Sequence, residues 1–371
     1  MTEGEPRTAM AGAQASLGRR AVRALATPEG RLALITVAVF ALMSLLAPER
    51  FLSAGNLVSM AFQFPEFAIL ALAMTLTMMT GGIDLSVVGV ANLSAVAAAT
   101  LLATFAPAGV DTLGALPWLA AAYAAALAVG ALCGALNGLL VANLALPPIL
   151  ATLGSGLVFT GIAVALTGGS AVMGFPDAIA WLGNGRLLGI PVPLIVFALL
   201  AALLHVVLTR TSFGLKATMY GANPLAALYA AIDTARLLLR VYVVSGAFAA
   251  VAGLVVMSRA NSAKADYGSS YLLLAVLIAV LGGVNPYGGR GKVIGVVLAV
   301  LSMQFLSSGL NMLGVSNFAR ELIWGALLIF VMLVNTFDWA GWRAERTRGR
   351  RRAPGGEPEA VRPAAGGSPP P

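Results

Sequence analysis

Charged residues are scarce in this chain of 371 residues, where Asp, Glu, Lys and Arg together make up only 10%. A soluble protein carries about a quarter of its residues as these four types. Here 59% of the residues are hydrophobic, and the mean hydropathy is +0.90. One cysteine, Cys133, excludes an intrachain disulfide, and one histidine, His205, leaves no histidine cluster for a metal. The composition predicts an integral membrane protein, and we expect no cofactor.

Catalytic motifs are missing as well. The sequence contains no HExxH, GxSxG or paired-carboxylate motif, so it shows no machinery for chemistry on a substrate. The pair Gly291-Lys292 fails as a phosphate-binding loop, because Val293 stands where Ser or Thr is needed. We therefore expect a protein that is not an enzyme and does not bind ATP by that device.

Ten apolar runs predict an all-α fold, a polytopic membrane protein of about ten transmembrane helices. The length of each run is close to the ~20 residues that cross a ~30 Å hydrocarbon core. The eighth run reaches this length only if the glycine-rich residues beside it are included. The runs are 32–46, 64–79, 87–105, 118–141, 149–166, 190–208, 241–257, 271–281, 293–313 and 322–337. Residues 31–340 thus form the membrane domain, residues 1–30 a basic arm, and residues 341–371 a disordered basic tail.

Lysine and arginine are distributed unevenly between the two sides that ten spans define. Five lie before the first run, four between the sixth and seventh runs, two at Arg290 and Lys292, and seven in the tail, which places 18 of the 23 on one side. Cytoplasmic loops carry such an excess, so both termini are expected in the cytoplasm. The net charge of +8 thus reflects topology, and we expect membrane lipid around the chain and no nucleic-acid partner.

A polar segment separates the second and third runs with almost no loop. Two glycines can end one helix there, and Asp84 can cap the next by accepting hydrogen bonds from amides near Ser86 and Val87. One interpretation is a tight turn in which Asp84 is only a cap. The other is a broken-helix element that lines a polar pathway, since ionisable residues in membranes are usually functional. The pathway candidates in this segment are Thr80, Gly81, Gly82, Asp84 and Ser86.

Two further patterns concern helix packing. Gly130, Gly134 and Gly138 form a small-residue face in the fourth run, which predicts close approach of a neighbouring helix and no role in substrate binding. Four polar residues in the ninth run are spaced so that they lie on about the same face of a helix. They either line a water-accessible face or form interhelical hydrogen bonds. These residues are Gln304, Ser307, Ser308 and Asn311, and Asn311 is the pathway candidate among them.

A polar, basic segment at 209–240 lies between the sixth and seventh runs and is cytoplasmic by the charge distribution. Asn223 followed by Pro224 predicts a helix start, since asparagine caps free amides and proline suits the first helical position. On a helix at 224–231, Leu225, Leu228 and Tyr229 share one face. That face either docks a soluble partner or only bridges two spans and packs on its own bundle, and we favour docking.

Several motifs in collinear order give this chain a family resemblance. They are the segments at 80–87, 146–154, 166–169, 283–291 and 308–311. Over about residues 32–337 the chain resembles the ribose-type permeases of bacterial ABC sugar importers. The segments at 261–268 and 281–289 look most like the branch for rhamnose, polyols and the autoinducer sugar.

The resemblance implies a membrane subunit without its own ATPase, in the bacterial inner (plasma) membrane. Two permease subunits, identical or different, would pair; two cytoplasmic ABC ATPases would bind beneath, and a periplasmic sugar-binding protein would deliver the sugar. It also implies a cytoplasmic coupling helix between spans six and seven, with Gly221, Asn223, Pro224, Leu225, Leu228 and Tyr229 as ATPase-docking candidates.

The chain departs from the family pattern at the end of that helix. The family has Gly-x-Asn followed by Ala-Ala-x-x-Ser-Gly-Ile. Here Gly221-Ala222-Asn223 is kept, but Ala230-Ala231-Ile232 replaces Ser-Gly-Ile. The docking helix is expected to remain, with a different local geometry at its end.

Three other functions remain open. An ion-coupled secondary transporter needs ionisable groups in its spans, and beyond Asp84 we expect these to be nearly absent. Related permeases carry nucleosides or branched-chain amino acids, so the cargo is not defined by the sequence. A membrane enzyme or scaffold is disfavoured by the missing catalytic motifs.

Overall fold

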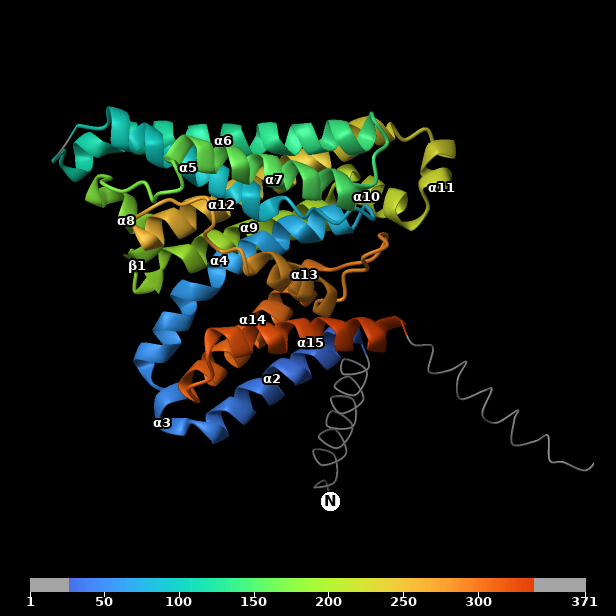
Figure 1. Ribbon diagram of the computed structural model, residues 1–371. Helices are drawn as coiled ribbons and strands as arrows, with labels where there is room; N and C mark the ends of the chain where they lie inside the picture. Colours follow the sequence, from blue (N-terminus) through green and yellow to red (C-terminus); the bar gives the residue numbers. More distant parts are fainter. Residues whose placement is uncertain (1–26, 108, 337–371) are drawn as a thin grey trace, which may run out of the picture. The chain divides into compact units, whose positions relative to one another are not determined.

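The computed structural model describes residues 27–107 and 109–336, and these residues are almost entirely helical (Figure 1). The helices are α2 (Pro28–Leu46), α3 (Pro48–Phe51), α4 (Ala54–Met78), α5 (Val87–Phe105), α6 (Thr112–Ala142), α7 (Pro148–Thr167), α8 (Ala180–Asn184), α9 (Val192–Arg210), α10 (Ser212–Ala222), α11 (Pro224–Tyr229), α12 (Thr234–Ala260), α13 (Tyr271–Leu281), α14 (Val293–Met312) and α15 (Asn317–Thr336). A short 3-10 turn (Asp177–Ile179) precedes α8, and one antiparallel hairpin pairs β1 (Arg186–Leu187) with β2 (Ile190–Pro191).

Within the described residues, eight helices are long and apolar enough to cross a membrane: α2, α4, α5, α6, α7, α9, α12 and α14. They confirm the predicted all-α membrane fold. The eighth predicted run is α13, whose 11 residues span only about 16 Å at 1.5 Å per residue. The tenth run falls in α15. The count of ten spans therefore remains a prediction, and the terminal arm and tail lie largely outside the described residues.

Among the residues that the structure describes, those up to Ile329 form one compact unit, and those from Phe330 to Thr336 group separately. In the first unit, α4, α5 and α12 form the buried centre, where about two thirds or more of each span is buried. The small-residue face of α6 packs on α12: a Cβ on Gly130 would come within 2.5 Å of the Gly246 carbonyl, and one on Gly134 would collide with the Tyr242 carbonyl. The predicted close approach is confirmed, and α12 is the partner.

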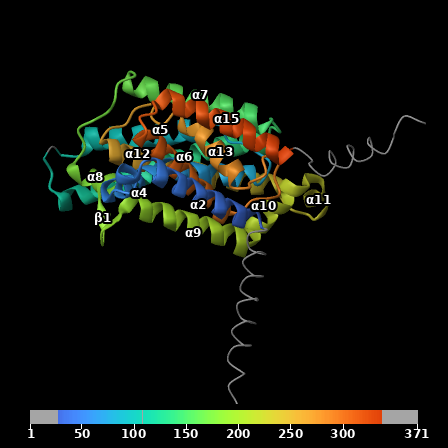
Figure 2. The same cartoon turned by 90° about the horizontal axis from the view of Figure 1, so that it is seen from below.

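The connections gather at two opposite ends of this unit. Helices α10 and α11 lie at one end, and α8 with β1 lies at the other, as the two views in Figures 1 and 2 agree. The α4–α5 break and the loop between α13 and α14 lie at the end that carries α10, because Gly221 of α10 is in contact with both. Two separate regions are therefore available for function.

Candidate functional site: a polar break, a coupling helix and a buried ion pair

The break between α4 and α5 holds a buried carboxylate. Gly81 adopts a left-handed φ of +77° and ends α4. Asp84 is only 2% exposed, and its Oδ1 accepts hydrogen bonds from the Ser86 amide at 3.0 Å and the Ser86 hydroxyl at 2.6 Å. The predicted hydrogen bond from the Ser86 amide is confirmed, but the prediction that Asp84 caps α5 is wrong: Ser86 is the residue that precedes the helix, and no side chain caps it. Asp84 instead closes the turn before α5 through Ser86. Thr80 is also buried, with its hydroxyl donated to the Thr77 carbonyl at 2.8 Å.

Side chains from three other helices complete this polar centre. Ser245 of α12 donates to Asp84 Oδ2 at 3.3 Å. Asn137 of α6 donates to the Ser86 hydroxyl at 2.7 Å and accepts from Ser155 of α7 at 2.5 Å. The sequence analysis missed this role of Asn137, although a polar residue beside the Gly138 of a packing face was a usable signal. A buried carboxylate is costly unless it is hydrogen-bonded, so this network explains how the bundle tolerates Asp84.

Gly82 and Tyr242 meet beside the carboxylate. A Cβ on Gly82 would come within 2.5 Å of the Tyr242 hydroxyl, so glycine leaves the room that this ring needs. Tyr242 is fully buried, and its hydroxyl has no hydrogen-bond partner among the described residues. A buried hydroxyl without a partner is uncommon. The break therefore contains one buried polar group whose hydrogen-bonding capacity is unused in this structure.

Three chain segments meet backbone to backbone at the same end of the bundle. The Gly289 amide donates to the Met79 carbonyl at 3.0 Å, which joins the α13–α14 loop to the end of α4. A Cβ on Gly221 would collide with that carbonyl and come within 2.5 Å of the Gly289 amide. The Gly81-Gly82 turn after α4 and the glycine-rich loop at 282–291 therefore touch each other. Helix α10, which precedes α11, packs directly on both through Gly221. Partial burial also raises the pKa of the adjacent Tyr220 hydroxyl.

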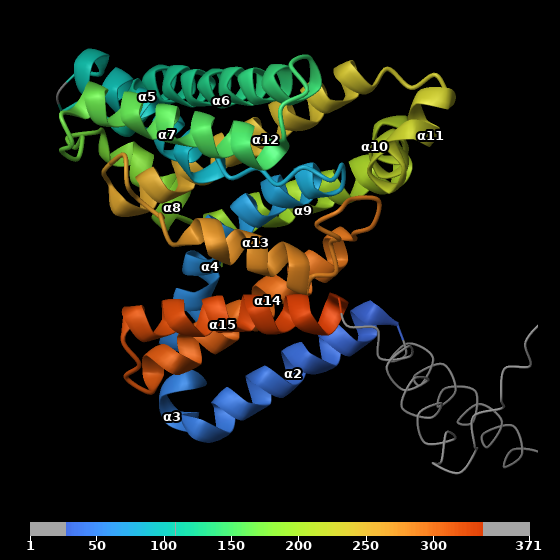
Figure 3. The ribbon, with the colours of Figure 1, turned by 45° about the vertical axis from the view of Figure 1, so that its right-hand side comes forward.

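Helix α11 starts where the sequence predicts. Asn223 Oδ1 accepts from the Ala226 amide at 3.0 Å, and Pro224 occupies the first turn. The predicted face is uncovered: Leu225 is 59% exposed, Leu228 60% and Tyr229 82%. The alternative in which these side chains pack on their own bundle is therefore wrong for the described chain. Figure 3 shows α11 at the outer edge of its end of the unit.

The residues that depart from the family pattern form the end of α11. The Ile232 amide donates to the Ala227 carbonyl at 3.1 Å, which closes the helix and requires a left-handed residue between them. That residue is Ala231, with a φ of +55°, at the position where the family pattern has glycine. The helix thus ends at Tyr229, two residues before the predicted 231.

We expect Ala231→Gly to stabilise this turn, because an L-residue in the left-handed region costs roughly 1–2 kcal/mol that glycine avoids. Hydrogen exchange of the amides of α11 in the purified protein measures the effect, and the expected result is slower exchange in the variant. Exchange that is unchanged or faster would mean that Ala231 is not strained.

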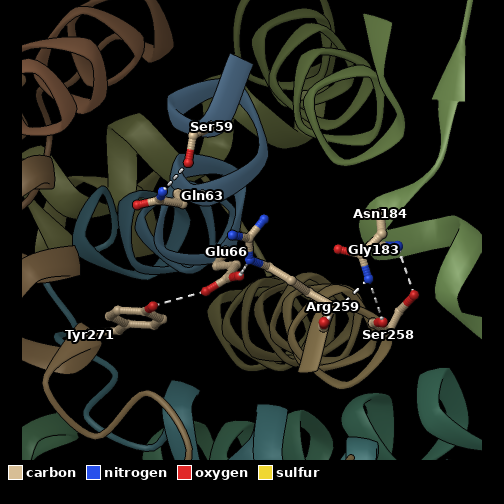
Figure 4. A network of polar contacts seen from close by, with 8 residues as sticks. All are labelled: Ser59, Gln63, Glu66, Gly183, Asn184, Ser258, Arg259 and Tyr271. Carbon is tan, nitrogen blue, oxygen red and sulfur yellow. Dashed lines mark hydrogen bonds and ion pairs between the residues drawn. The ribbon is translucent and has the colours of Figure 1, made fainter. Parts of the chain in front are cut away.

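A second polar network lies toward the other end of the unit, and the sequence analysis missed it (Figure 4). Glu66, in the middle of α4, is 8% exposed and pairs with Arg259 of α12 through Oε1 and Nε at 2.8 Å. Its Oε2 accepts from the Tyr271 hydroxyl at 2.8 Å. Ionisable groups beyond Asp84 were expected to be nearly absent from the spans, and Glu66 is an exception that was not named. Glu66 lies inside the predicted second run, and a lone acidic residue in an apolar run was the signal.

Asn311 lies apart from the polar break. It belongs to the last turn of α14 and is exposed, whereas the loop that contacts Gly81 precedes the first turn of that helix. Of the other polar residues in this run, Ser308 donates to Asn56 Oδ1 at 2.9 Å, which is an interhelical hydrogen bond. The structure therefore brings together the candidates at 80–86 and does not bring Asn311 to them.

Comparisons with known proteins place the chain in a family and identify several relatives. The model of the family described as "Branched-chain amino acid transport system / permease component" matches residues 56–332. Three relatives carry the name "Autoinducer 2 import system permease protein LsrD". The one from Photorhabdus temperata is 36% identical over 312 residues, which cover 81% of this chain and 90% of the relative. The one from Yersinia enterocolitica is 35% identical over 294 residues (78% and 86%), and the one from Escherichia coli K12 is 35% identical over 290 residues (76% and 84%). No solved structure matches.

Proposed function

The chain belongs to this family of transport-system permease components, and from that membership we propose that it is the membrane permease subunit of an ATP-driven importer for a sugar or related polyol. The observation that carries the proposal is the uncovered apolar face of α11, at the end of a segment that rests on the Asp84 break. A soluble ATPase that holds this face would act directly on the break. The sugar-like cargo is inferred from the names of the relatives.

The proposed arrangement places the partners at the two ends of the bundle. The excess of lysine and arginine around 209–240 and in both termini supports a cytoplasmic position for α11 and its ATPase. The end that carries α8 and β1 would then face the periplasm and receive the solute from a binding protein. A second permease subunit, identical or different, would complete the pathway between two such bundles.

The test is reconstitution with an ATPase and a binding protein in liposomes. We expect uptake of a labelled sugar that requires ATP and all three components. Uptake that needs a proton or sodium gradient and no ATPase would instead support an ion-coupled transporter. Glu66 gives no support to that rival, because its carboxylate is already held by Arg259 and Tyr271.

The family description favours one competing cargo, a branched-chain amino acid. The same reconstituted system distinguishes it from a sugar by competition. Excess leucine should leave sugar uptake unchanged, and excess unlabelled sugar should abolish it. Inhibition by leucine alone would assign the amino acid.

We propose that the Asp84 carboxylate serves the pathway as well as the turn before α5, and Asp84→Asn separates the two roles. Asparagine can still accept from the Ser86 amide, and the loss at Ser245 costs about 1 kcal/mol, so the complex should assemble. Uptake is expected to fall several-fold because the charge is lost. Wild-type uptake by an assembled complex would show that Asp84 only holds the turn.

A further inference from the structure

A polar pocket of about 350 Å3 opens beside the Glu66–Arg259 pair. Its lining includes Gly55, Ser59 and Phe62 from α4, Asn184 and Arg186 from the α8–β1 segment, and Arg259 from α12. Figure 4 shows Ser59, Asn184 and Arg259 arriving from these three elements. The volume lies at the lower end of the range of small-ligand sites, about 300–1,000 Å3.

Hydrogen bonds hold the wall of this pocket in place. The amide of Asn184 donates to the carbonyls of Ser258 and Arg259 at 3.3 and 3.2 Å, and the Ser258 hydroxyl accepts from the Gly183 amide at 2.7 Å. These contacts fix α8 to the last turn of α12. Arg259 is held at its Nε by Glu66, so its guanidinium is oriented before any ligand arrives.

The pocket offers both donors and acceptors without an uncompensated buried charge. Glu66 neutralises Arg259 while leaving its Nη groups without a partner among the described residues. Ser59 accepts from Gln63 at 2.6 Å, which leaves its hydroxyl hydrogen to donate, and Asn184 keeps its Oδ1 as an acceptor. Arg186 is exposed and lies 5.6 Å over the Phe62 ring, so water solvates its charge.

This combination suits an uncharged molecule with several hydroxyl groups. A hydroxyl both donates and accepts, so it can use the Arg259 Nη groups and the Asn184 oxygen together. A simple carboxylate such as acetate offers acceptors only, and it would compete with Glu66 for a cation that is already paired. We infer that the pocket is the outer binding site of the permease for a small, neutral polyhydroxylated solute. In this site the Arg259 Nη groups donate hydrogen bonds to the hydroxyls of the solute. The inference rests on the proposed function, which places this end outside.

Gly55 provides the test, because it lines the pocket and a side chain can begin there without a clash. A Cβ on Gly55 meets no atom within 4 Å, and its φ is not left-handed, so the backbone accepts Gly55→Phe. Leu57→Phe is the matched control, since Leu57 is 41% exposed on the same helix and does not line the pocket. Ser59→Leu is a second filling variant, one helical turn further on, in case Gly55→Phe does not fold.

Solute binding is measured by saturation-transfer NMR on the purified full-length permease in lipid nanodiscs. The neutral probes are ribose, rhamnose, xylitol and autoinducer 2, each at tens of millimolar, and acetate, which has no hydroxyl group, is the anionic probe. We expect transfer to at least one neutral probe with the wild type and Leu57→Phe, and loss of that signal with Gly55→Phe and Ser59→Leu. Acetate should show none.

Three results would overturn the inference: no transfer to any neutral probe, a signal that both filling variants retain, or transfer to acetate alone, which would assign an anion site. The outcome is separable from that of the proposed function. If uptake depends on the ATPase but no solute binds the permease alone, the pocket is not a solute site and the importer function stands. If solute binds but uptake does not depend on the ATPase, the importer function is wrong and the pocket still binds solute.

Discussion

Leu228→Glu is expected to abolish association with the ATPase while leaving membrane insertion unchanged. Leu228 is 60% exposed on α11, between Leu225 and Tyr229 on the same face. If an ATPase groove covers this face, the substitution puts an unpaired charge into a buried contact. Such a change costs roughly 2–5 kcal/mol, which corresponds to about 30-fold to several-thousand-fold in affinity. Co-purification with the ATPase, alongside the membrane yield, measures it.

The matched control is Leu188→Glu, the same chemical change at the opposite end of the unit. Leu188 lies in the turn between β1 and β2 and is 95% exposed. This variant should keep the ATPase at the wild-type level. Retained ATPase in Leu228→Glu at normal yield would mean that α11 does not dock, and the importer assignment would lose its central support.

Arg259→Met is expected to destabilise the bundle more than any other change considered above. It leaves the Glu66 carboxylate buried in α4 with only the Tyr271 hydroxyl to stabilise it. Removing one partner of a buried pair costs about 3–5 kcal/mol, because the remaining charge loses its compensation. The Arg259 side chain is 28% exposed, so we expect the lower end of that range. A lower midpoint of thermal unfolding in detergent is the measurement. The double variant Glu66→Gln/Arg259→Met should recover most of the loss, since glutamine carries no charge.

Arg186→Met controls for the loss of a guanidinium in the same region. Arg186 is exposed, and the ring contact with Phe62 is worth about 0.5–1 kcal/mol at an exposed site, so the midpoint should barely move. Equal midpoints for Arg259→Met and the wild type would show that Glu66 is stabilised by something other than this ion pair.

Local signals in the sequence determined the elements and several of their ends. Apolar runs marked the spans because a lipid-facing helix must be apolar along its length. Asn223 and Pro224 marked the start of α11, since capping acts within one turn of helix. The Gly81–Asp84 segment marked the break between α4 and α5, and the glycines of α6 marked a packing face. Hydropathy misplaced the start of a helix that begins with polar residues, as at Ala54 in α4, and it did not reveal that the eighth run is a helix of only 11 residues.

Only the tertiary structure decided which of these elements meet. The sequence placed Asp84 in a turn, but Asn137, Ser155 and Ser245 reach its network from three other helices. Glu66 and Tyr271 are 205 positions apart, so no local pattern could pair them. Which helix faces oppose each other is set by packing over the whole bundle, whereas caps, turns and hydropathy act over a few residues. The same reason explains why the exposure of Leu228 could be hypothesised from its spacing and was determined only by the fold.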